Sequence, residues 1–117
     1  MRVLGLTWLG TRASRFEDMV GFAEQVLGLD RSFERDGVVG FELADGSLFE
    51  VFAPGTPGGG HPPEGVVGGF RVDDVTAARA QLEAAGAEVG ELQTAGGGAW
   101  VYFRAPDGNL YELIGSA

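Results

Sequence analysis

Two glutamates lie in nearly the same local sequence, and carboxylates held at fixed places can bind a cation or transfer a proton. The surrounding segments are Asp45-Gly-Ser-Leu-Phe-Glu-Val51 and Asp107-Gly-Asn-Leu-Tyr-Glu-Leu113, in a chain of 117 residues. Each segment is typical of a tight Asp-Gly turn that leads into a strand. Because strand side chains alternate between faces, Glu50 shares a face with Phe52, and Glu112 takes the equivalent place. The repeat predicts duplication of one supersecondary unit.

The rest of the sequence predicts the same order of elements twice: a strand, a helix and three further strands. Apolar residues recur at helical spacing from Phe16 to Leu27 and again from Val75 to Ala85. Ser14-Arg-Phe-Glu17 is a capping-box pattern at the first helix start. The strands are expected at 3–11, 31–36, 38–43 and 48–53 in the first half and at 66–72, 87–93, 99–104 and 109–114 in the second.

The remaining helix ends carry turn and capping residues. Gly28 and Gly86 follow the last apolar position of each helix, where a glycine commonly ends a helix. Asp73 or Asp74 can cap the start of the second helix. These features predict an α+β fold with two helices.

The length predicts a single domain, 1–117, made of two βαβββ modules of about 1–53 and 66–117. Prolines and glycines are concentrated at 54–65, which is therefore expected to be the linker. Neither module is long enough to bury its sheet alone, so we expect the two to pack together or to share a sheet.

The composition excludes several kinds of protein. The formal net charge of −9 argues against a nucleic-acid partner. It weakly favours cationic or neutral ligands, but a role in solubility alone is the preferred explanation of this charge. There is no cysteine to act as a nucleophile or a metal ligand. We expect no membrane association, because no apolar run is long enough to cross a bilayer and residues 1–30 lack a signal-peptide pattern. A cytoplasmic location is the expectation.

Three segments are characteristic in combination with the paired modules: Leu27-Gly-Leu29, Val72-Asp-Asp-Val75 and Ala105-Pro-Asp-Gly-Asn-Leu-Tyr-Glu-Leu113. Together they resemble the vicinal oxygen chelate superfamily, which includes glyoxalase I, extradiol dioxygenases and bleomycin-resistance proteins. Ala105 departs from the family, which usually has aspartate there. The resemblance implies a curved, mostly antiparallel sheet around a concave groove. It does not fix the function, because members of the superfamily do different things on one scaffold.

Metal-dependent members of this superfamily take ligands from the first and last strands of each module. The last-strand positions carry over to Glu50 and Glu112, whereas the first-strand positions, usually histidine, carry over to Trp8 and Val67. Neither Trp8 nor Val67 can ligate a divalent metal, and two carboxylates alone make a poor transition-metal site. The single histidine, His61, lies in the expected linker. We therefore expect neither a metal nor a cofactor.

The resemblance places a set of side chains on the groove. Two accounts of them remain open. In one, Arg12 and Arg71 neutralise Glu50 and Glu112, because a buried unpaired carboxylate is costly. In the other, the glutamates hold a ligand's cationic group or act as acid and base. Trp8 would then form a stacking wall. The expected ligand-binding residues are Trp8, Arg12, Glu50, Phe52, Val67, Arg71, Phe103 and Glu112.

Two functions follow from this interpretation. The favoured one is a metal-free binding protein similar to the bleomycin-resistance branch, which would confer antibiotic resistance by holding a bulky, cationic or aromatic small molecule. The alternative is a metal-independent lyase or isomerase with Glu50 or Glu112 as the general base. We also expect a homodimer, because the sheet would otherwise leave strand edges uncovered.

Overall fold

A computed structural model describes residues 1–55 and 65–117 of the chain. These residues form two compact units, one of Trp8–Val67 and one of Met1–Thr7 together with Gly68–Ala117. We name them the Glu50 unit and the Glu112 unit. The α+β class and the mostly antiparallel pairing are confirmed, since the only parallel ladders found in the described ranges pair β1 with β4 and β5 with β9. None of the helices in the described residues is long and apolar enough to cross a membrane.

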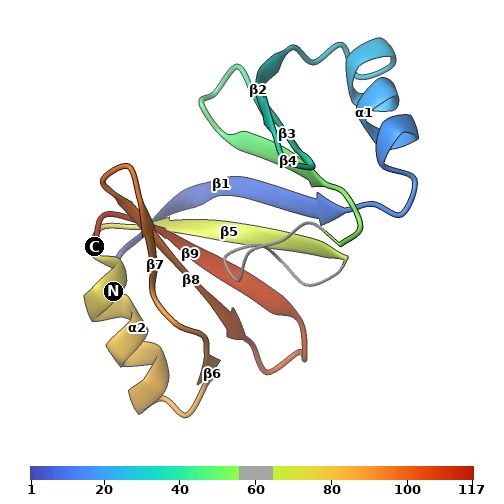
Figure 1. Ribbon diagram of the computed structural model, residues 1–117. Helices are drawn as coiled ribbons and strands as arrows, with labels where there is room; N and C mark the ends of the chain where they lie inside the picture. Colours follow the sequence, from blue (N-terminus) through green and yellow to red (C-terminus); the bar gives the residue numbers. More distant parts are fainter. Residues whose placement is uncertain (56–64) are drawn as a thin grey trace. The chain divides into compact units, whose positions relative to one another are not determined.

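The Glu50 unit has its strands in the order β2-β3-β4-β1, with α1 packed on one face (Figure 1). The ladders from β2 to β3 and from β3 to β4 are antiparallel. The second half of β1 runs parallel to β4. The elements are β1 (Val3–Arg12), α1 (Phe16–Gln25), β2 (Arg31–Arg35), β3 (Val38–Glu42) and β4 (Leu48–Phe52).

The Glu112 unit repeats this plan with an additional short strand. Its strand order is β5-β9-β8-β6, and β7 also pairs with β8. The helix α2 lies beside these strands (Figure 1) and packs against β8 and β9. The elements are β5 (Val66–Val72), α2 (Val75–Ala84), β6 (Glu88–Val89), β7 (Gln93–Ala95), β8 (Gly98–Arg104) and β9 (Leu110–Gly115).

Each unit has an apolar core between its helix and one face of its sheet. Such a core forms because alternate strand residues and one stripe of the helix are apolar. The core of the Glu50 unit consists of Val20, Ala23, Val39, Phe41 and Val51. That of the Glu112 unit consists of Val72, Val75, Ala78, Ala99, Val101 and Leu113.

The two Asp-Gly turns have the same geometry, as the repeat predicts. The amides of Ser47 and Asn109 donate to the carboxylates of Asp45 and Asp107, each at 2.9 Å. The glycine after each aspartate has a positive φ, 85° for Gly46 and 84° for Gly108. Each turn therefore starts its last strand in the same register, with the glutamate at its middle.

One predicted strand is wrong in its extent. The run expected at 87–93 is divided into β6 and β7, which pair with the two ends of β8. Residues 90–92, which connect β6 to β7, lie opposite residues 101–102 of β8, so the connecting segment has one extra residue. An extra residue interrupts a ladder as a β-bulge does. Gly90 keeps one bond across the gap, from its N–H to the carbonyl of Tyr102 at 2.8 Å.

The helix caps differ between the two units. Asp74 accepts a hydrogen bond from the N–H of Ala77 at 2.9 Å, as its position predicts. The capping box expected at Ser14 is wrong: α1 begins after Arg15 and has no side-chain cap. Arg15 instead pairs with Asp18 in the first turn, where an acidic side chain is favoured by the helix dipole.

Candidate functional site on the Glu50 face

Glu50 lies at the middle of β4 and is flanked by a glycine on both sides. Its register partner on β1 is Gly10, and its partner on β3 is Gly40. The adjacent residues Phe49 and Val51 point to the opposite face, where α1 packs. We call the face of the sheet opposite α1 the Glu50 face; it carries Trp8, Gly10, Arg12, Phe33, Arg35, Gly40, Glu50 and Phe52.

Trp8 binds the Glu50 carboxylate directly. The indole N–H of Trp8 donates a hydrogen bond to Oε1 of Glu50. The ring can reach it because it lies over Gly10, where a Cβ atom would overlap the indole. Phe52 packs edge-on against the same ring, with the ring centroids 6.5 Å apart. Trp8 is 5% exposed, so the carboxylate is held by a buried donor in a fixed orientation.

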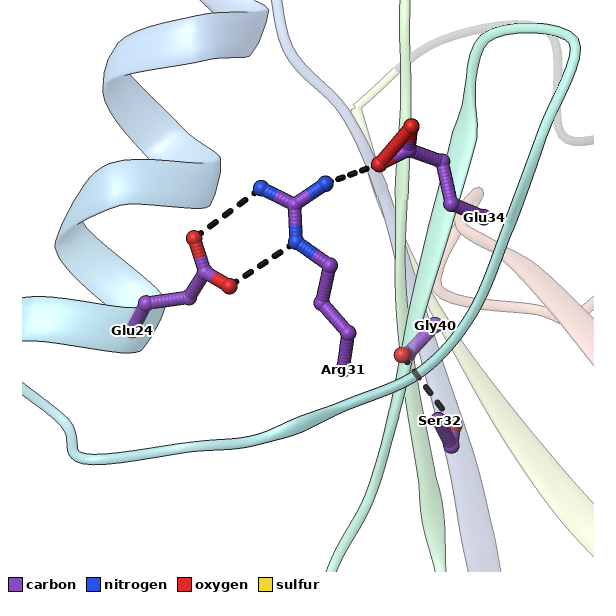
Figure 2. A network of polar contacts seen from close by, with 5 residues as sticks. All are labelled: Glu24, Arg31, Ser32, Glu34 and Gly40. Atoms are coloured by element: carbon purple, nitrogen blue, oxygen red, sulfur yellow. Dashed lines mark hydrogen bonds and ion pairs between the residues drawn. The ribbon is translucent and has the colours of Figure 1, made fainter.

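A bulge in β2 brings the side chains of Phe33 and Arg35 to the Glu50 face. The register between β2 and β3 shifts between Arg31 and Phe33, which leaves Ser32 as the extra residue. The hydroxyl of Ser32 donates to the carbonyl of Gly40 at 3.1 Å, as Figure 2 shows. After the shift Phe33 is opposite Gly40, and its ring occupies the space that a Cβ atom of Gly40 would need. Two glycines thus make room for two aromatic rings beside one carboxylate.

The same bulge directs Arg31 to the α1 side of the sheet. Arg31 bonds to both carboxylate oxygens of Glu24 on α1, at 2.8 and 3.0 Å, and also pairs with Glu34 (Figure 2). In a regular strand Arg31 and Phe33 would share a face, because they are two residues apart. The bulge places them on opposite faces of the sheet. Arg31 therefore binds α1, whereas Phe33 lies on the Glu50 face.

The electrostatic surroundings of Glu50 act in opposite directions. Burial raises the pKa of the Glu50 carboxyl above its usual 4.5, because burial penalises the charged form. The hydrogen bond from Trp8 and the positive charge of Arg35 act to lower this pKa, and burial is the largest effect. Glu50 therefore keeps a proton to a higher pH than a solvent-exposed glutamate does.

Both arginines of this face lie over aromatic rings. The guanidinium carbon of Arg35 is 5.0 Å from the centre of the Phe33 ring, and that of Arg12 is 5.7 Å from the centre of Phe52. Arg12 also donates to the carbonyl of Ala53 at 2.6 Å. The positive charge that acts on Glu50 comes from Arg35, which the sequence analysis did not single out.

The Glu112 unit presents its glutamate in different surroundings. Glu112 is 3% exposed and is the one buried charged residue among the residues described. Its register partners are Gly69 on β5 and Tyr102 on β8. On β5, Val67 and the exposed Arg71 lie two residues before and after Gly69, as the repeat predicts. Val67 has no N–H in its side chain to donate, so the interaction of Trp8 with Glu50 has no counterpart at this position.

One predicted ligand-binding residue, Phe103, is not part of either arrangement. Phe103 alternates with Tyr102 along β8, so it lies on the α2 face and packs against the core there. It lines a separate cavity of about 490 Å³ with Leu82 and Pro106. His61 lies outside the described residues.

A divalent metal does not fit the donors around Glu50. Trp8 stands at the position where the resemblance places a ligand, and an indole N–H is a donor without a free lone pair. Within residues 1–55 and 65–117 there is no group of three or more histidine, cysteine, aspartate or glutamate side chains that can hold a metal ion. Transition-metal sites in proteins normally use three or four such ligands.

The residues that sequence analysis missed are Phe33 and Arg35, together with the role of Gly40. Their signal is weak but readable. A glycine inside a strand often marks a bulge or a close approach of another group. Gly40 lies between the apolar residues Val39 and Phe41 of β3 and is such a mark. Which ring fills the space depends on the bulge at Ser32, which no alternation pattern reveals.

Comparison with known proteins supports the fold at the level of a superfamily. Residues 5–113 match the model of the Glyoxalase/Bleomycin resistance protein/Dioxygenase superfamily. A search of curated proteins gave no match.

Solved structures with this fold include proteins of different activities. A superfamily member from Vibrio splendidus 12B01 has 19% identity and a TM-score of 0.70, over 92% of this chain and 96% of that one. A methylmalonyl-CoA epimerase from Streptomyces coelicolor, in complex with 2-nitronate-propionyl-CoA, has 20% identity and a TM-score of 0.72, over 99% of both chains. A Mn(II)-bound glyoxalase from Novosphingobium aromaticivorans has 23% identity and a TM-score of 0.74, over 97% of this chain but 39% of that one.

The family match covers nearly the whole sequence, and the two repeated turns have the geometry that the sequence repeat predicts. The chain therefore belongs to the glyoxalase/bleomycin resistance protein/dioxygenase superfamily.

Proposed function

We propose that this protein is a metal-free member of its superfamily that binds a bulky small molecule with a cationic or aromatic group at the Glu50 face. The observation that carries the proposal is the contact between Trp8 and Glu50. The resemblance aligns Trp8 with the position where metal-dependent members usually have a ligand histidine. Its indole N–H donates to a carboxylate oxygen of Glu50, which orients the ring. A carboxylate beside aromatic rings suits the recognition of a cationic group on a flat molecule.

The absence of metal is part of this proposal. After dialysis, elemental analysis of the purified protein should find no stoichiometric divalent metal, because the donors around Glu50 are too few and Trp8 engages the carboxylate. About one metal ion per chain that resists a chelator would overturn the proposal and favour glyoxalase or dioxygenase chemistry.

The binding test is a thermal-shift screen of glycopeptide, anthracycline-like and intercalating molecules. A ligand at one hundred times its dissociation constant adds about 2.7 kcal/mol to the stability of the folded state, which is a visible shift for a domain of this size. Trp8→Ala and Glu50→Gln should weaken binding, the second more strongly at low salt. Glu17→Gln, which removes an exposed charge on α1, is the matched control. Equal binding by Glu50→Gln and Glu17→Gln would exclude Glu50 from recognition.

A second candidate function is a metal-independent isomerase or lyase with a glutamate as the general base. The observation that favours it is the raised pKa of Glu50, since a base works best when its pKa is nearer to the working pH. The epimerase among the structural neighbours shares only the fold at 20% identity. For Glu112, 3% exposure leaves little room for a substrate to reach the carboxylate. Glu50 is therefore the stronger candidate for a base.

Recovery of the bound molecule separates the two functions. A binding protein returns its ligand chemically unchanged. An enzyme returns a converted product, and conversion should be abolished by Glu50→Gln and unaffected by a chelator. If conversion persists in Glu50→Gln but not in Glu112→Gln, the base is Glu112.

We also propose that the protein forms a homodimer. The first half of β1 exposes three large apolar side chains, Val3, Leu4 and Leu6, of which Leu6 is 63% exposed. Exposed apolar residues grouped on one strand are typical of a surface that contacts another chain. Light scattering should give twice the chain mass of 12.2 kDa, and Leu4→Lys with Leu6→Lys should reduce it to one chain. A single-chain mass for the unchanged protein would refute the dimer.

A further inference from the structure

The Glu50 face combines a carboxylate with an arginine that is not committed to another acidic group. Arg15, Arg31 and Arg79 each form an ion pair with a nearby acidic side chain. Arg35 makes none of these pairs. Its side chain is exposed and lies over the Phe33 ring at 5.0 Å. Stacking on an aromatic face fixes a guanidinium in place while its N–H groups stay free to bind an anion.

The register brings Arg35 and Glu50 to the same face of the sheet. Phe33 is opposite Gly40, and Gly40 is opposite Glu50. Arg35 follows two residues later on β2 and is opposite Val38, so it extends from the same side as Phe33. The bulge at Ser32 produces this arrangement, since it moves both side chains away from the α1 face.

Both charged groups, the Glu50 carboxylate and the Arg35 guanidinium, are held in position by neighbouring aromatic side chains. The Trp8 N–H fixes one oxygen of Glu50, and the Phe33 ring supports Arg35. Arg12 at the other end of the face is different, because it already donates to the carbonyl of Ala53. Charges of opposite sign on one face favour a ligand that carries both signs, since each end then has a partner.

We propose that Arg35 is a specificity-determining residue of this face that binds an anionic group of the ligand, while the ligand's cationic group lies at Glu50. The ligand class is then a zwitterion with an aromatic or bulky apolar body, as in an amino acid or a peptide-like compound. This inference rests on the proposed binding function and narrows its ligand class.

Three probes with the same phenyl group separate the two charges. Phenylalanine carries both an ammonium and a carboxylate, 2-phenylethylamine only the ammonium, and 3-phenylpropionate only the carboxylate. Their dissociation constants are measured by ligand-observed NMR titration of the full chain and of Arg35→Gln. Arg15→Gln, at the exposed start of α1, is the matched control for loss of one positive charge.

We expect phenylalanine to bind at least about three times more tightly than 2-phenylethylamine, which is the size of effect that an exposed charge contact predicts. Arg35→Gln should remove this difference by weakening the binding of phenylalanine, without weakening the binding of 2-phenylethylamine. Arg15→Gln should retain the difference. A folded Arg35→Gln protein with unchanged Tm would show that the loss is local.

Other outcomes would overturn the inference in distinguishable ways. If 2-phenylethylamine binds as tightly as phenylalanine and its binding requires Glu50, the proposed function stands and the role of Arg35 fails. If 3-phenylpropionate binds through Arg35 and Glu50→Gln has no effect, the cationic half of the proposed function fails. Absence of binding by all three probes would refute both.

Discussion

Glu50 and Glu112 occupy equivalent places in two copies of one structural unit, yet their surroundings differ. Each has a glycine opposite it on the first strand of its unit, Gly10 and Gly69. On the other side Glu50 faces Gly40, whereas Glu112 faces Tyr102. Glu50 is partly exposed and bound by Trp8; Glu112 is buried.

This difference shows that one repeated scaffold can place the same residue in two different surroundings. The turn and the strand fix where the carboxylate sits, and they are the same in both units. The neighbouring side chains decide whether that carboxylate is accessible. Gly40 of the Glu50 unit corresponds to Tyr102 of the Glu112 unit, and it leaves room for the Phe33 ring. Trp8 corresponds to Val67, and it supplies a hydrogen-bond donor. Substitutions that exchange these features test the comparison.

The largest effect is expected from Gly40→Ala in the Glu50 unit. The added methyl group would overlap the Phe33 ring, which must then move. Overpacking of this kind typically costs about 1–3 kcal/mol. Chemical denaturation should report the loss. Gly68→Ala in the Glu112 unit is the matched control, because its methyl group would meet only Leu6, at 3.9 Å. Equal stability of the two variants would mean that Phe33 does not pack on Gly40.

Glu112→Gln should be the next most disruptive change. Replacing a buried carboxyl group with an amide disturbs the contacts that make its burial tolerable, which typically costs about 1–2 kcal/mol. Glu50→Gln should not destabilise the fold at pH 7, since the amide oxygen can still accept from Trp8 and the cost of burying a charge is removed. Urea denaturation of both variants compares them directly. A larger loss for Glu50→Gln would reverse the assignment of structural and accessible carboxylates.

The stability of the unchanged protein and that of Glu50→Gln should depend differently on pH. Because burial raises the pKa of Glu50, the folded state holds this proton more tightly than the unfolded state. The stability that this bound proton contributes is fully present below pH 4.5, and it is lost as the pH rises through the folded-state pKa of Glu50. Glu50→Gln lacks this loss and should gain stability relative to the unchanged protein above pH 4.5. Thermal melts between pH 4 and pH 8 measure the difference; parallel profiles would show that Glu50 has an ordinary pKa.

The smallest effects are expected from the two arginines that tie each helix to its sheet. Arg31 joins α1 to β2 through Glu24, and Arg79 of α2 donates to the carbonyl of Gly90 at 2.9 Å. Exposed ion pairs contribute little, because water screens them and the long side chains lose freedom. Arg31→Gln and Arg79→Gln should each lower the Tm slightly. A large decrease for Arg31→Gln alone would mean that the contact with α1 maintains the bulge that positions Phe33.

Much of this protein could be read from the sequence because the informative interactions are local. The Asp-Gly turns, the mid-strand place of each glutamate and the cap at Asp74 depend on residues a few positions apart. The repeated segments predicted a glutamate at the middle of a strand in each half, and aligning the two halves through their helix starts paired Trp8 with Val67. The superfamily followed from motifs that span the chain, and the family match confirmed it.

Other features were decided by contacts between distant segments. Trp8 binds Glu50 across the ladder between β1 and β4, and the bulge at Ser32 turns Phe33 and Arg35 to that same face, where Gly40 of β3 leaves space for the Phe33 ring. A one-residue insertion reverses the face of every residue beyond it, so strand alternation cannot predict these positions. The cap expected at Ser14 and the strand expected at 87–93 failed for a related reason. Local preference is weak compared with the packing and pairing that the tertiary structure imposes.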